Sequence, residues 1–282
     1  ALWPLGGRRW AVRGGEAMAV KRMLALSPAG AGGLVIARAR RSSFYASLGT
    51  RLDGIAASVE LDLGTVPERS ISTFEHRIVR IADALPQATL EELRRQASNT
   101  ALRERSYVPA HKKGGTVAYE SLFETAPSIV ALYHSPQMKA LVSRIVGTAV
   151  QPTPIHDQSS LSVLLYERPG DHIGWHYDHN FYRGRHFTVL LVVVNEGSGA
   201  GLSHATLKAM IGTRETLVAA PPNTLVVFEG ARVRHKVTPL LAGERRLVIS
   251  MTYCTDPRAN LLQGAVRRLK DVAFFGPRAL WT

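Results

Sequence analysis

The sequence has a single cysteine in 282 residues and no stretch of eighteen or more apolar residues. One thiol can form no internal disulfide and no cysteine-rich metal site, which favours a reducing compartment. Without a long apolar run, the sequence predicts no membrane-spanning helix. The cysteine itself, Cys254, lies in the apolar run 247–254, and we interpret it as a core residue rather than a nucleophile.

Acidic residues are also scarce, but the shortage is uneven along the chain. The formal net charge is +13, a value that suggests a nucleic-acid binder. Residues 1–52 hold nine basic residues and one acid, whereas the other 230 residues hold 26 basic and 21 acidic residues. The excess therefore belongs mainly to the N-terminal segment, and the nearly balanced body argues against a nucleic-acid partner.

Residues 1–60 are rich in Ala, Gly and Arg and show little helical or strand periodicity. This composition fits an organelle transit segment. A disordered tail, or leader sequence upstream of a start at Met18 or Met23, is the alternative. We therefore expect residues 1–60 to lie outside the folded core of an intracellular protein, which would be organellar if the segment is a transit peptide.

Residues 61–158 are dense in helix-forming residues. Thr89 and Glu92 have the spacing of a capping box ahead of a helix that reaches Arg105. Ser135 precedes a proline and caps an expected helix at 137–146, which Gly147 ends. A further short helix is expected at 126–134. We interpret this part as a helical region that packs on the core.

Residues 159–256 have a different character, because short β-rich runs alternate with turn residues. The expected strands are 161–166, 173–178, 187–194, 216–219, 224–228 and 247–253. Several short strands with close turns favour a sandwich or barrel of the jelly-roll kind, with helices packed outside. The fold class is therefore mainly β with flanking helices (α+β). Residues 257–282, with an expected helix at 260–270 and an apolar tail, are expected to cover the β core.

A candidate metal site begins with His176 and Asp178. Residues i and i+2 of a strand point to the same face, so both side chains can reach one ion. Such a pair arises easily by chance and needs a third ligand, for which His235 is the candidate. Two histidines and one carboxylate on one face of an octahedron bind iron(II) and leave the other positions open.

The neighbourhood of His235 adds a candidate anion site. Arg245 lies ten positions beyond His235 and begins the following expected strand, so it can point into the same barrel. A guanidinium offers a rigid two-pronged donor that suits a carboxylate. Tyr166, ten residues before His176, could reach the same carboxylate. A one-residue bulge near Gly243 would instead turn Arg246 inward.

Together these elements resemble the 2-oxoglutarate/iron(II) dioxygenase superfamily, and within it the prolyl-hydroxylase-like branch. The matching elements, in order, are Tyr166 with Pro169-Gly170-Asp171, the pair His176 and Asp178, His235-x-Val237-x-Pro239, and Gly243-x-Arg245. The resemblance covers about a third of the chain. The mid-barrel sequence Gly199-Ala200-Gly201-Leu202-Ser203 departs from the paired glycines that are usual there, so the substrate side differs from that of a typical peptidyl-prolyl enzyme.

The resemblance implies a double-stranded β-helix core and an oxidoreductase of the hydroxylase type. His176, Asp178 and His235 would be the catalytic metal ligands, and Arg245 and Tyr166 would bind the co-substrate. Fe(II) is the implied cofactor, with 2-oxoglutarate and O2 as co-substrates that yield succinate and CO2, and ascorbate is a further candidate. Halogenases of this superfamily carry Gly or Ala in place of the carboxylate ligand, so Asp178 predicts a hydroxylated, desaturated or cyclised product.

The sequence leaves other functions open. A nucleic-acid-acting dioxygenase is suggested by the basic charge, and a non-catalytic metal-binding β-barrel would retain the same ligands. We expect a small molecule, an amino acid or a peptide as substrate and no membrane partner, with the oligomeric state unassigned. The segment His111-Lys112-Lys113-Gly114-Gly115 is most simply a solvated loop, with closure over an anionic substrate as the alternative.

Overall fold

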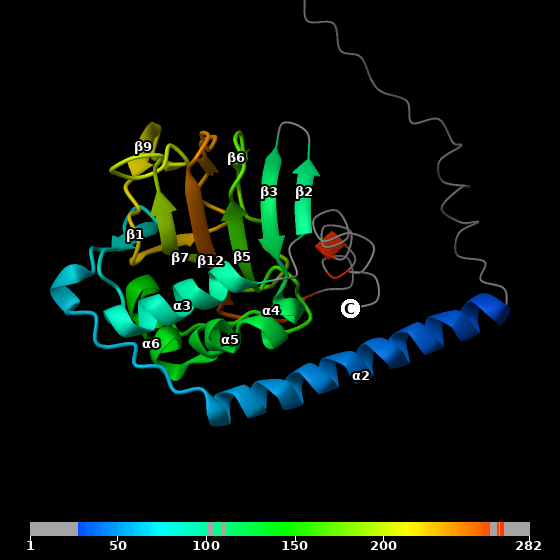
Figure 1. Ribbon diagram of the computed structural model, residues 1–282. Helices are drawn as coiled ribbons and strands as arrows, with labels where there is room; N and C mark the ends of the chain where they lie inside the picture. Colours follow the sequence, from blue (N-terminus) through cyan, green and yellow to red (C-terminus); the bar gives the residue numbers. More distant parts are fainter. Residues whose placement is uncertain (1–27, 101–103, 109–110, 260–263, 265, 268–282) are drawn as a thin grey trace, which may run out of the picture. The chain divides into compact units, whose positions relative to one another are not determined.

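The computed structural model describes residues 28–100, 104–108, 111–259, 264 and 266–267 (Figure 1). Internal contacts divide the chain into two units, residues 1–43 and residues 44–282. Of the first unit, only residues 28–43 are described, and they form the beginning of helix α2 (Pro28–Ser58). The second unit contains all the other described elements. Within the described residues, no helix is long and apolar enough to cross a membrane.

The end of α2 belongs to the hydrophobic core of the second unit. Leu48 and Ile55 are buried in the same apolar cluster as the main strands, and Phe44 and Leu52 pack against it. The expectation that residues 1–60 lie outside the core is therefore wrong for 44–58. These four apolar residues recur every three or four positions, the helical period, in a segment whose Gly and Arg content concealed it. Residues 1–27, where a transit segment is expected, lie outside the described residues.

Four further α-helices are present in the described part of the second unit, after a short 3-10 turn, η1 (Glu68–Ser70). They are α3 (Gln87–Asn99), α4 (Tyr119–Thr125), α5 (Pro127–His134) and α6 (Pro136–Val146). The start of α6 is as expected, because the Ser135 hydroxyl accepts a hydrogen bond from the Met138 amide at 3.0 Å, and Gly147 ends the helix with a φ of 69°. The Thr89 capping box is wrong: α3 begins at Gln87, and the Thr89 hydroxyl donates to the Asp62 carbonyl at 2.5 Å.

Twelve strands follow or interleave these helices in the described residues. They are β1 (Ile78–Ile81), β2 (Glu104–Val108), β3 (Lys112–Val117), β4 (Gln151–Pro152), β5 (Leu161–Tyr166), β6 (His172–His176), β7 (His186–Glu196), β8 (Leu207–Ile211), β9 (Arg214–Val218), β10 (Thr224–Glu229), β11 (His235–Val237) and β12 (Arg245–Cys254). The six expected strands all have counterparts. Beyond residue 259 only 264, 266 and 267 are described, so the expected helix at 260–270 and the tail fall largely outside the described residues.

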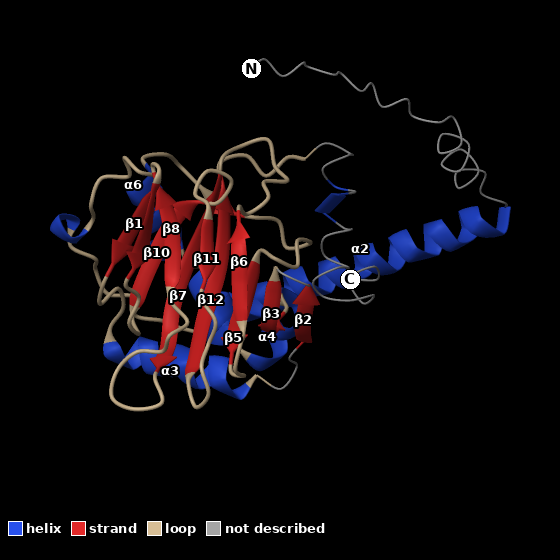
Figure 2. Cartoon of the chain, turned by 90° about the horizontal axis from the view of Figure 1, so that it is seen from above, coloured by secondary structure: helices blue, strands red, loops and turns tan. Residues whose placement is uncertain are grey.

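The strands form an antiparallel barrel that is nearly closed. The order along the sheet is β1-β10-β7-β12-β5-β3-β6-β11-β8-β9. One half contains β1, β10, β7, β12 and β5, and the other contains β6, β11, β8 and β9. Figure 2 views the barrel so that strands of the two halves overlap, with helices behind them. Strand β3 pairs with β5 at one end and with β6 at the other, so it joins the two halves. This arrangement is the predicted double-stranded β-helix, or jelly roll.

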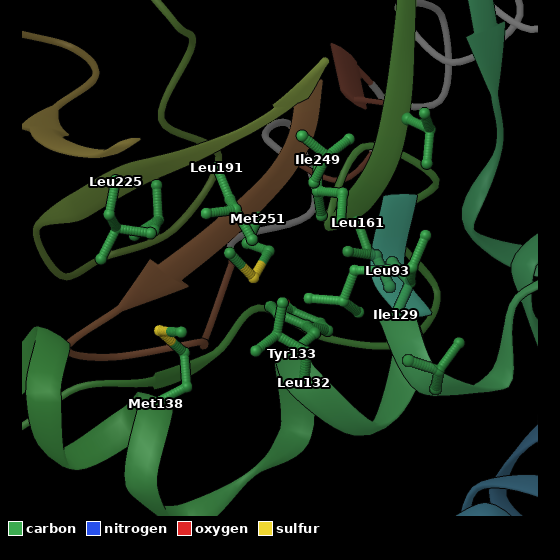
Figure 3. Packing of buried hydrophobic residues seen from close by; sticks show 14 of the residues in the cluster. Leu93, Ile129, Leu132, Tyr133, Met138, Leu161, Leu191, Leu225, Ile249 and Met251 are labelled. Atoms are coloured by element: carbon green, nitrogen blue, oxygen red, sulfur yellow. The ribbon is translucent and has the colours of Figure 1, made fainter. Parts of the chain in front are cut away.

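The larger half of the barrel has an apolar face covered by the helices. Figure 3 shows Leu161, Leu191, Ile249 and Met251 of the strands meeting Leu93, Ile129, Leu132 and Met138 of helices α3, α5 and α6. The alternate residues of the same strands face the barrel interior and form a smaller second cluster. Cys254 is buried, and burial raises the pKa of its thiol to about 12, which agrees with a core role.

Candidate metal centre

Three side chains from two strand ends meet inside the barrel. His176 ends β6, Asp178 follows it, and His235 begins β11 directly opposite His176 in the ladder. One ligand atom from each of the three residues lies within 4.8 Å of the others. Nε2 of His176 and Nε2 of His235 lie 3.4 and 3.8 Å from the same Asp178 oxygen, Oδ1. The structure thus brings together all three metal ligands expected from the sequence.

Both imidazoles are held in the orientation that a metal ligand needs. Nδ1 of His176 lies 2.8 Å from the carbonyl oxygen of Gly174, and Nδ1 of His235 lies 3.0 Å from that of Val233. A carbonyl oxygen can only accept, so Nδ1 carries the proton and the Nε2 lone pair faces the shared space. Burial also lowers the pKa of His235. This lowered pKa favours the neutral form that binds metals.

The carboxylate of Asp178 is held by Thr188 of β7, and its side chain packs against Gly230, which follows β10. Oδ2 of Asp178 accepts a hydrogen bond of 2.5 Å from the Thr188 hydroxyl. Burial by itself raises the pKa of Asp178, but His235, His176 and Thr188 outweigh it and hold the pKa well below its usual range. A Cβ atom at Gly230 would lie 2.8 Å from the Asp178 Cβ, so only glycine fits there. Sequence reasoning missed Thr188, whose polar side chain stands out in the apolar run of β7.

The three candidate metal ligands line a cavity of about 240 Å³. Its walls come from both halves of the barrel and from β3. Hydroxyl groups form part of the wall, at Ser162, Ser250 and Thr252, and apolar side chains form another part, at Leu164, Leu190, Leu207 and Val248. A cavity of mixed character beside an open metal site is suited to a small polar ligand.

The arginine that enters this cavity is Arg246, not Arg245. Arg246 is 1% exposed and lines the cavity, and burial lowers the pKa of its guanidinium. The Arg245 side chain is about 35% exposed. Its Nε lies 3.4 Å from Oε1 of Glu167, and neither residue lines the cavity. The expectation that Arg245 points into the barrel is therefore wrong by one residue. Arg246 shares its side of β12 with Ser250 and Thr252, whereas Arg245 shares its side with Leu247 and the helix-facing core.

Tyr166 also lies where expected, on the cavity wall opposite Arg246 in the ladder. The Arg246 guanidinium carbon lies 5.3 Å from the centre of the Tyr166 ring. Within the described residues, the Tyr166 hydroxyl and Nε and Nη2 of Arg246 have no hydrogen-bond partner. Burial raises the pKa of Tyr166 to about 12, so its hydroxyl keeps its proton and can donate. Unpartnered buried donors of this kind are costly unless a ligand accepts from them.

The segment 111–115 is a strand rather than a solvated loop. Lys112 begins β3, is buried, and lines the cavity together with His111. Lys113 points the other way, and its Nζ donates to the Pro169 carbonyl at 3.0 Å. The loop interpretation failed because Lys and Gly have low strand propensity, whereas this strand is fixed by its pairing with β5 and β6.

Comparisons with known proteins bear on the fold. A family model described as Halogenase D (HalD) matches residues 71–196, less than half of the chain. No curated protein matches the chain. Among solved structures, the non-heme alpha-ketoglutarate-dependent epimerase SnoN of nogalamycin biosynthesis has a TM-score of 0.55 and 17% identity, over 66% of this chain and 80% of that one. SnoN has also been solved in complex with Fe3+, alpha-ketoglutarate and nogalamycin RO.

Two further structures are similar. A prolyl hydroxylase from Trichoplax adhaerens, in complex with a peptide of hypoxia-inducible factor, has a TM-score of 0.54 and 17% identity, over 68% of this chain and 87% of that one. An oxidoreductase of the 2OG-Fe(II) oxygenase family from Burkholderia pseudomallei has a TM-score of 0.53 and 15% identity, over 72% and 97%. The chain has the fold of the 2-oxoglutarate/iron(II) oxygenases. At these identities the likeness concerns the fold alone.

Proposed function

We propose that this chain is an iron(II)- and 2-oxoglutarate-dependent dioxygenase. It would oxidise an unactivated C–H bond of a small molecule, an amino acid or a peptide, with release of succinate and CO2. The observation that carries the proposal is that a candidate metal site and a candidate carboxylate-binding site lie in one cavity. An open site of two histidines and one carboxylate shares that cavity with a buried guanidinium that has unpartnered donors.

The donor set at 176, 178 and 235 fits iron(II). Two imidazole nitrogens and one carboxylate oxygen on one side of an ion are the ligands of non-heme iron oxygenases, and they leave positions free for substrates. Iron bound there supplies the redox chemistry with O2 that protein side chains lack. The chain's own part is to fix the tautomers through Gly174 and Val233 and to hold the carboxylate through Thr188.

Arg246 and Tyr166 fit the distal carboxylate of 2-oxoglutarate. The guanidinium supplies Nε and Nη2, and the phenol supplies one O–H, all buried in the cavity wall. A carboxylate accepting from these groups would satisfy every donor and neutralise the buried charge. The co-substrate ligand proposed here is therefore Arg246 in place of Arg245, with Tyr166 as the second contact.

Asp178 favours oxygen transfer, desaturation or cyclisation over chlorination. The matching family model is named for a halogenase, and its range includes both His176 and Asp178. Halogenases of this superfamily leave the carboxylate position free for chloride by carrying Gly or Ala there. A carboxylate at 178 occupies that position. Detection of a chlorinated product from the unmodified protein would contradict this part of the proposal.

The test is succinate formation by the full chain with iron(II) and 2-oxoglutarate. We expect the wild-type protein to bind one equivalent of iron and to form succinate slowly even without a primary substrate. His235→Ala should lose both properties, because two of three ligands hold the ion poorly. His172→Ala, in the same strand as His176 but outside the cavity lining, is the matched control and should keep both. Full iron binding and turnover in His235→Ala would refute the assigned triad.

The substrate class is tested in the same assay. A panel of amino acids, peptides and small metabolites is screened for succinate formed above the uncoupled background. DNA and RNA are added separately over a range of salt concentrations, because binding through phosphates would be strongly salt-dependent. Stimulation by nucleic acid and by nothing else would favour the nucleic-acid-acting alternative.

A further inference from the structure

The end of strand β10 carries a buried carboxylate that the proposed reaction does not use. Glu229 is the last residue of β10 and is 5% exposed. Nη1 of Arg77 lies 2.7 Å from its Oε2, and Nη2 and Nε of Arg185 lie 3.0 and 3.4 Å from Oε2 and Oε1. Burial by itself raises the pKa of Glu229, but the two arginines outweigh it and hold the pKa below its ordinary value. The carboxylate is therefore ionised at neutral pH.

Glu229 joins three neighbouring strands of the sheet. Arg77 immediately precedes β1 and Arg185 immediately precedes β7, and both of these strands pair with β10. The main chain adds a second link, because the Glu229 amide donates to the Arg77 carbonyl at 3.0 Å. Arg77 has a φ of 58°, which is uncommon for a residue with a side chain and persists only where the surroundings hold it. Glu229 contacts both the main chain and the side chain of Arg77, so the two residues fix each other.

The turn at residues 229–233, here the β10 turn, holds two of the candidate metal ligands. The Gly230 carbonyl oxygen accepts a hydrogen bond of 3.0 Å from the Asp178 amide. The carbonyl oxygen of the first residue of the turn accepts one of 3.0 Å from the Val233 amide. The Val233 carbonyl oxygen in turn lies 3.0 Å from Nδ1 of His235. A shift of the β10 turn would therefore move a main-chain partner of Asp178 and the acceptor that fixes the His235 tautomer.

We propose that Glu229 is a positioning residue for the candidate metal site. Its ion pairs with the two arginines fix the β10 turn, and the turn keeps Asp178 and His235 where both can reach one ion. Glu229 does not line the cavity, so it acts on the site through the turn alone. The inference rests on the proposed function in one respect, namely that these ligands bind a metal. Groups that orient the ligands of a metal contribute to its affinity without touching it.

The test measures metal binding by the full chain. Cobalt(II) is the probe, because its visible absorption bands report the geometry of the ligands, and iron(II) is measured by competition with a chelator. Glu229→Gln keeps the size of the side chain, but a carboxamide has only one acceptor oxygen and no charge. This variant should bind both metals about tenfold more weakly than wild type. At saturating cobalt its absorption bands should still differ from those of wild type, because the bound ligands have moved.

Glu244→Gln is the matched control. Glu244 is also a buried carboxylate, 4% exposed, and it holds a loop by accepting from the amides of His204 and Leu241. It does not line the cavity. Both variants should lower the melting temperature. Only Glu229→Gln should change the cobalt bands, and the metal affinity of Glu244→Gln should stay within about twofold of wild type. This contrast separates positioning of the ligands from a general loss of stability.

The two arginines test the same route. Arg77 and Arg185 are 50% and 43% exposed in their side chains, so replacement by Met is tolerated more easily than a change at the buried carboxylate. Arg77→Met and Arg185→Met should each weaken cobalt binding by about threefold. When both guanidinium groups are absent, Glu229→Gln should weaken binding no further, because residues of one network are not additive. If Glu229→Gln does not fold, the two arginine variants replace it.

Three results would overturn the proposal. They are unchanged metal affinity and cobalt bands in Glu229→Gln, equal losses of affinity in Glu229→Gln and Glu244→Gln, and a further large loss when Glu229→Gln is added to the variant without both arginines. Metal binding that depends on Glu229, without any succinate formation, would refute the proposed function and leave this inference standing. Succinate formation with a metal affinity that is independent of Glu229 would do the reverse. A wild-type chain that binds no metal would refute both.

Discussion

The two sides of strand β12 differ, because one packs in the apolar core and the other lines the cavity. The residues of one side, Leu247, Ile249, Met251 and Tyr253, enter the apolar core beneath the helices. The residues of the other side, Arg246, Val248, Ser250 and Thr252, line the cavity. A single step along the strand therefore separates a residue that packs in the core from one that lines the cavity. Substitutions on the first side should change stability, and substitutions on the second should change binding.

The largest expected effect is on the helix-facing side. Ile249→Ala removes a fully buried side chain from the centre of the core and should lower the free energy of unfolding by about 2–5 kcal/mol. Ser250→Ala, one position along and facing the cavity, should change it by less than about 1 kcal/mol. Urea denaturation of both variants measures the difference. Equal losses would break the division of β12 into two surfaces.

The second prediction concerns the neighbouring arginines. Arg246→Met should raise the apparent constant for 2-oxoglutarate by about 30-fold or more, equivalent to about 2 kcal/mol, because the co-substrate carboxylate loses its buried partner. Arg245→Met should change it by less than about threefold, as for a partly exposed ion pair. Titration of 2-oxoglutarate with succinate as the readout decides between them. The reverse ranking would restore Arg245 as the ligand.

Unlike its affinity for 2-oxoglutarate, the thermal stability of Arg246→Met should not decrease. Removing a buried guanidinium that has unpartnered donors relieves its desolvation cost, so the melting temperature of Arg246→Met should not fall. A large fall would mean that Arg246 serves the fold rather than the site.

The third prediction concerns the close contact between Gly230 and Asp178, one of the candidate metal ligands. Gly230→Ala introduces a Cβ only 2.8 Å from the Asp178 Cβ and 3.0 Å from the Thr188 hydroxyl. The carboxylate must shift, and iron affinity should fall by about tenfold, although no ligand is removed. Iron competition with a chelator measures this effect. Gly199→Ala, where a Cβ would meet no atom within 4 Å, is the matched control and should be neutral.

The smallest expected effect concerns α2, and it tests whether the end of this helix contributes to the apolar core. Ile55 of α2 is buried at the edge of the core, so Ile55→Ala should cost about 1 kcal/mol of stability without changing the 2-oxoglutarate constant. A chain that starts at Leu61 should lose more, because Leu48 is removed as well. Melting curves that match those of the full chain would mean that α2 adds nothing to the core.

Much of the β core could be predicted because its strands carry long apolar runs bounded by turns. Strands β5, β7, β10 and β12 all follow this pattern. The pair His176 and Asp178, together with the sequence that follows His235, indicated the three candidate metal ligands that meet in the cavity. The missed strand β3 contains Lys112, Lys113, Gly114 and Gly115. Its polar residues serve the cavity or the surface, and its strand conformation depends on tertiary pairing that local propensity does not report.

The alternation of side chains along β12 separates Arg245 from Arg246 at the level of sequence. The large apolar residues of the run fall at odd positions from Leu247 onward, and the polar ones fall at Ser250 and Thr252. If the large residues face the helix-covered core, Arg246 must face inward. Counting ten positions from His235 takes no account of this alternation. For deciding which arginine faces inward, the side-chain pattern of the strand is more reliable than a spacing taken from a family.

Strand β3 changes partners within a few residues, from β5 at positions 115–117 to β6 at positions 112–113. Each of these two ladders is therefore short, and Gly114 lies at the point of exchange. On its other edge β3 pairs with β2 over five positions. The two halves of the barrel are thus joined at β3 by only a few hydrogen bonds, and the β3 amides that pair with β5 and β6 are expected to exchange with deuterium sooner than those in the longer ladder of β7 and β12.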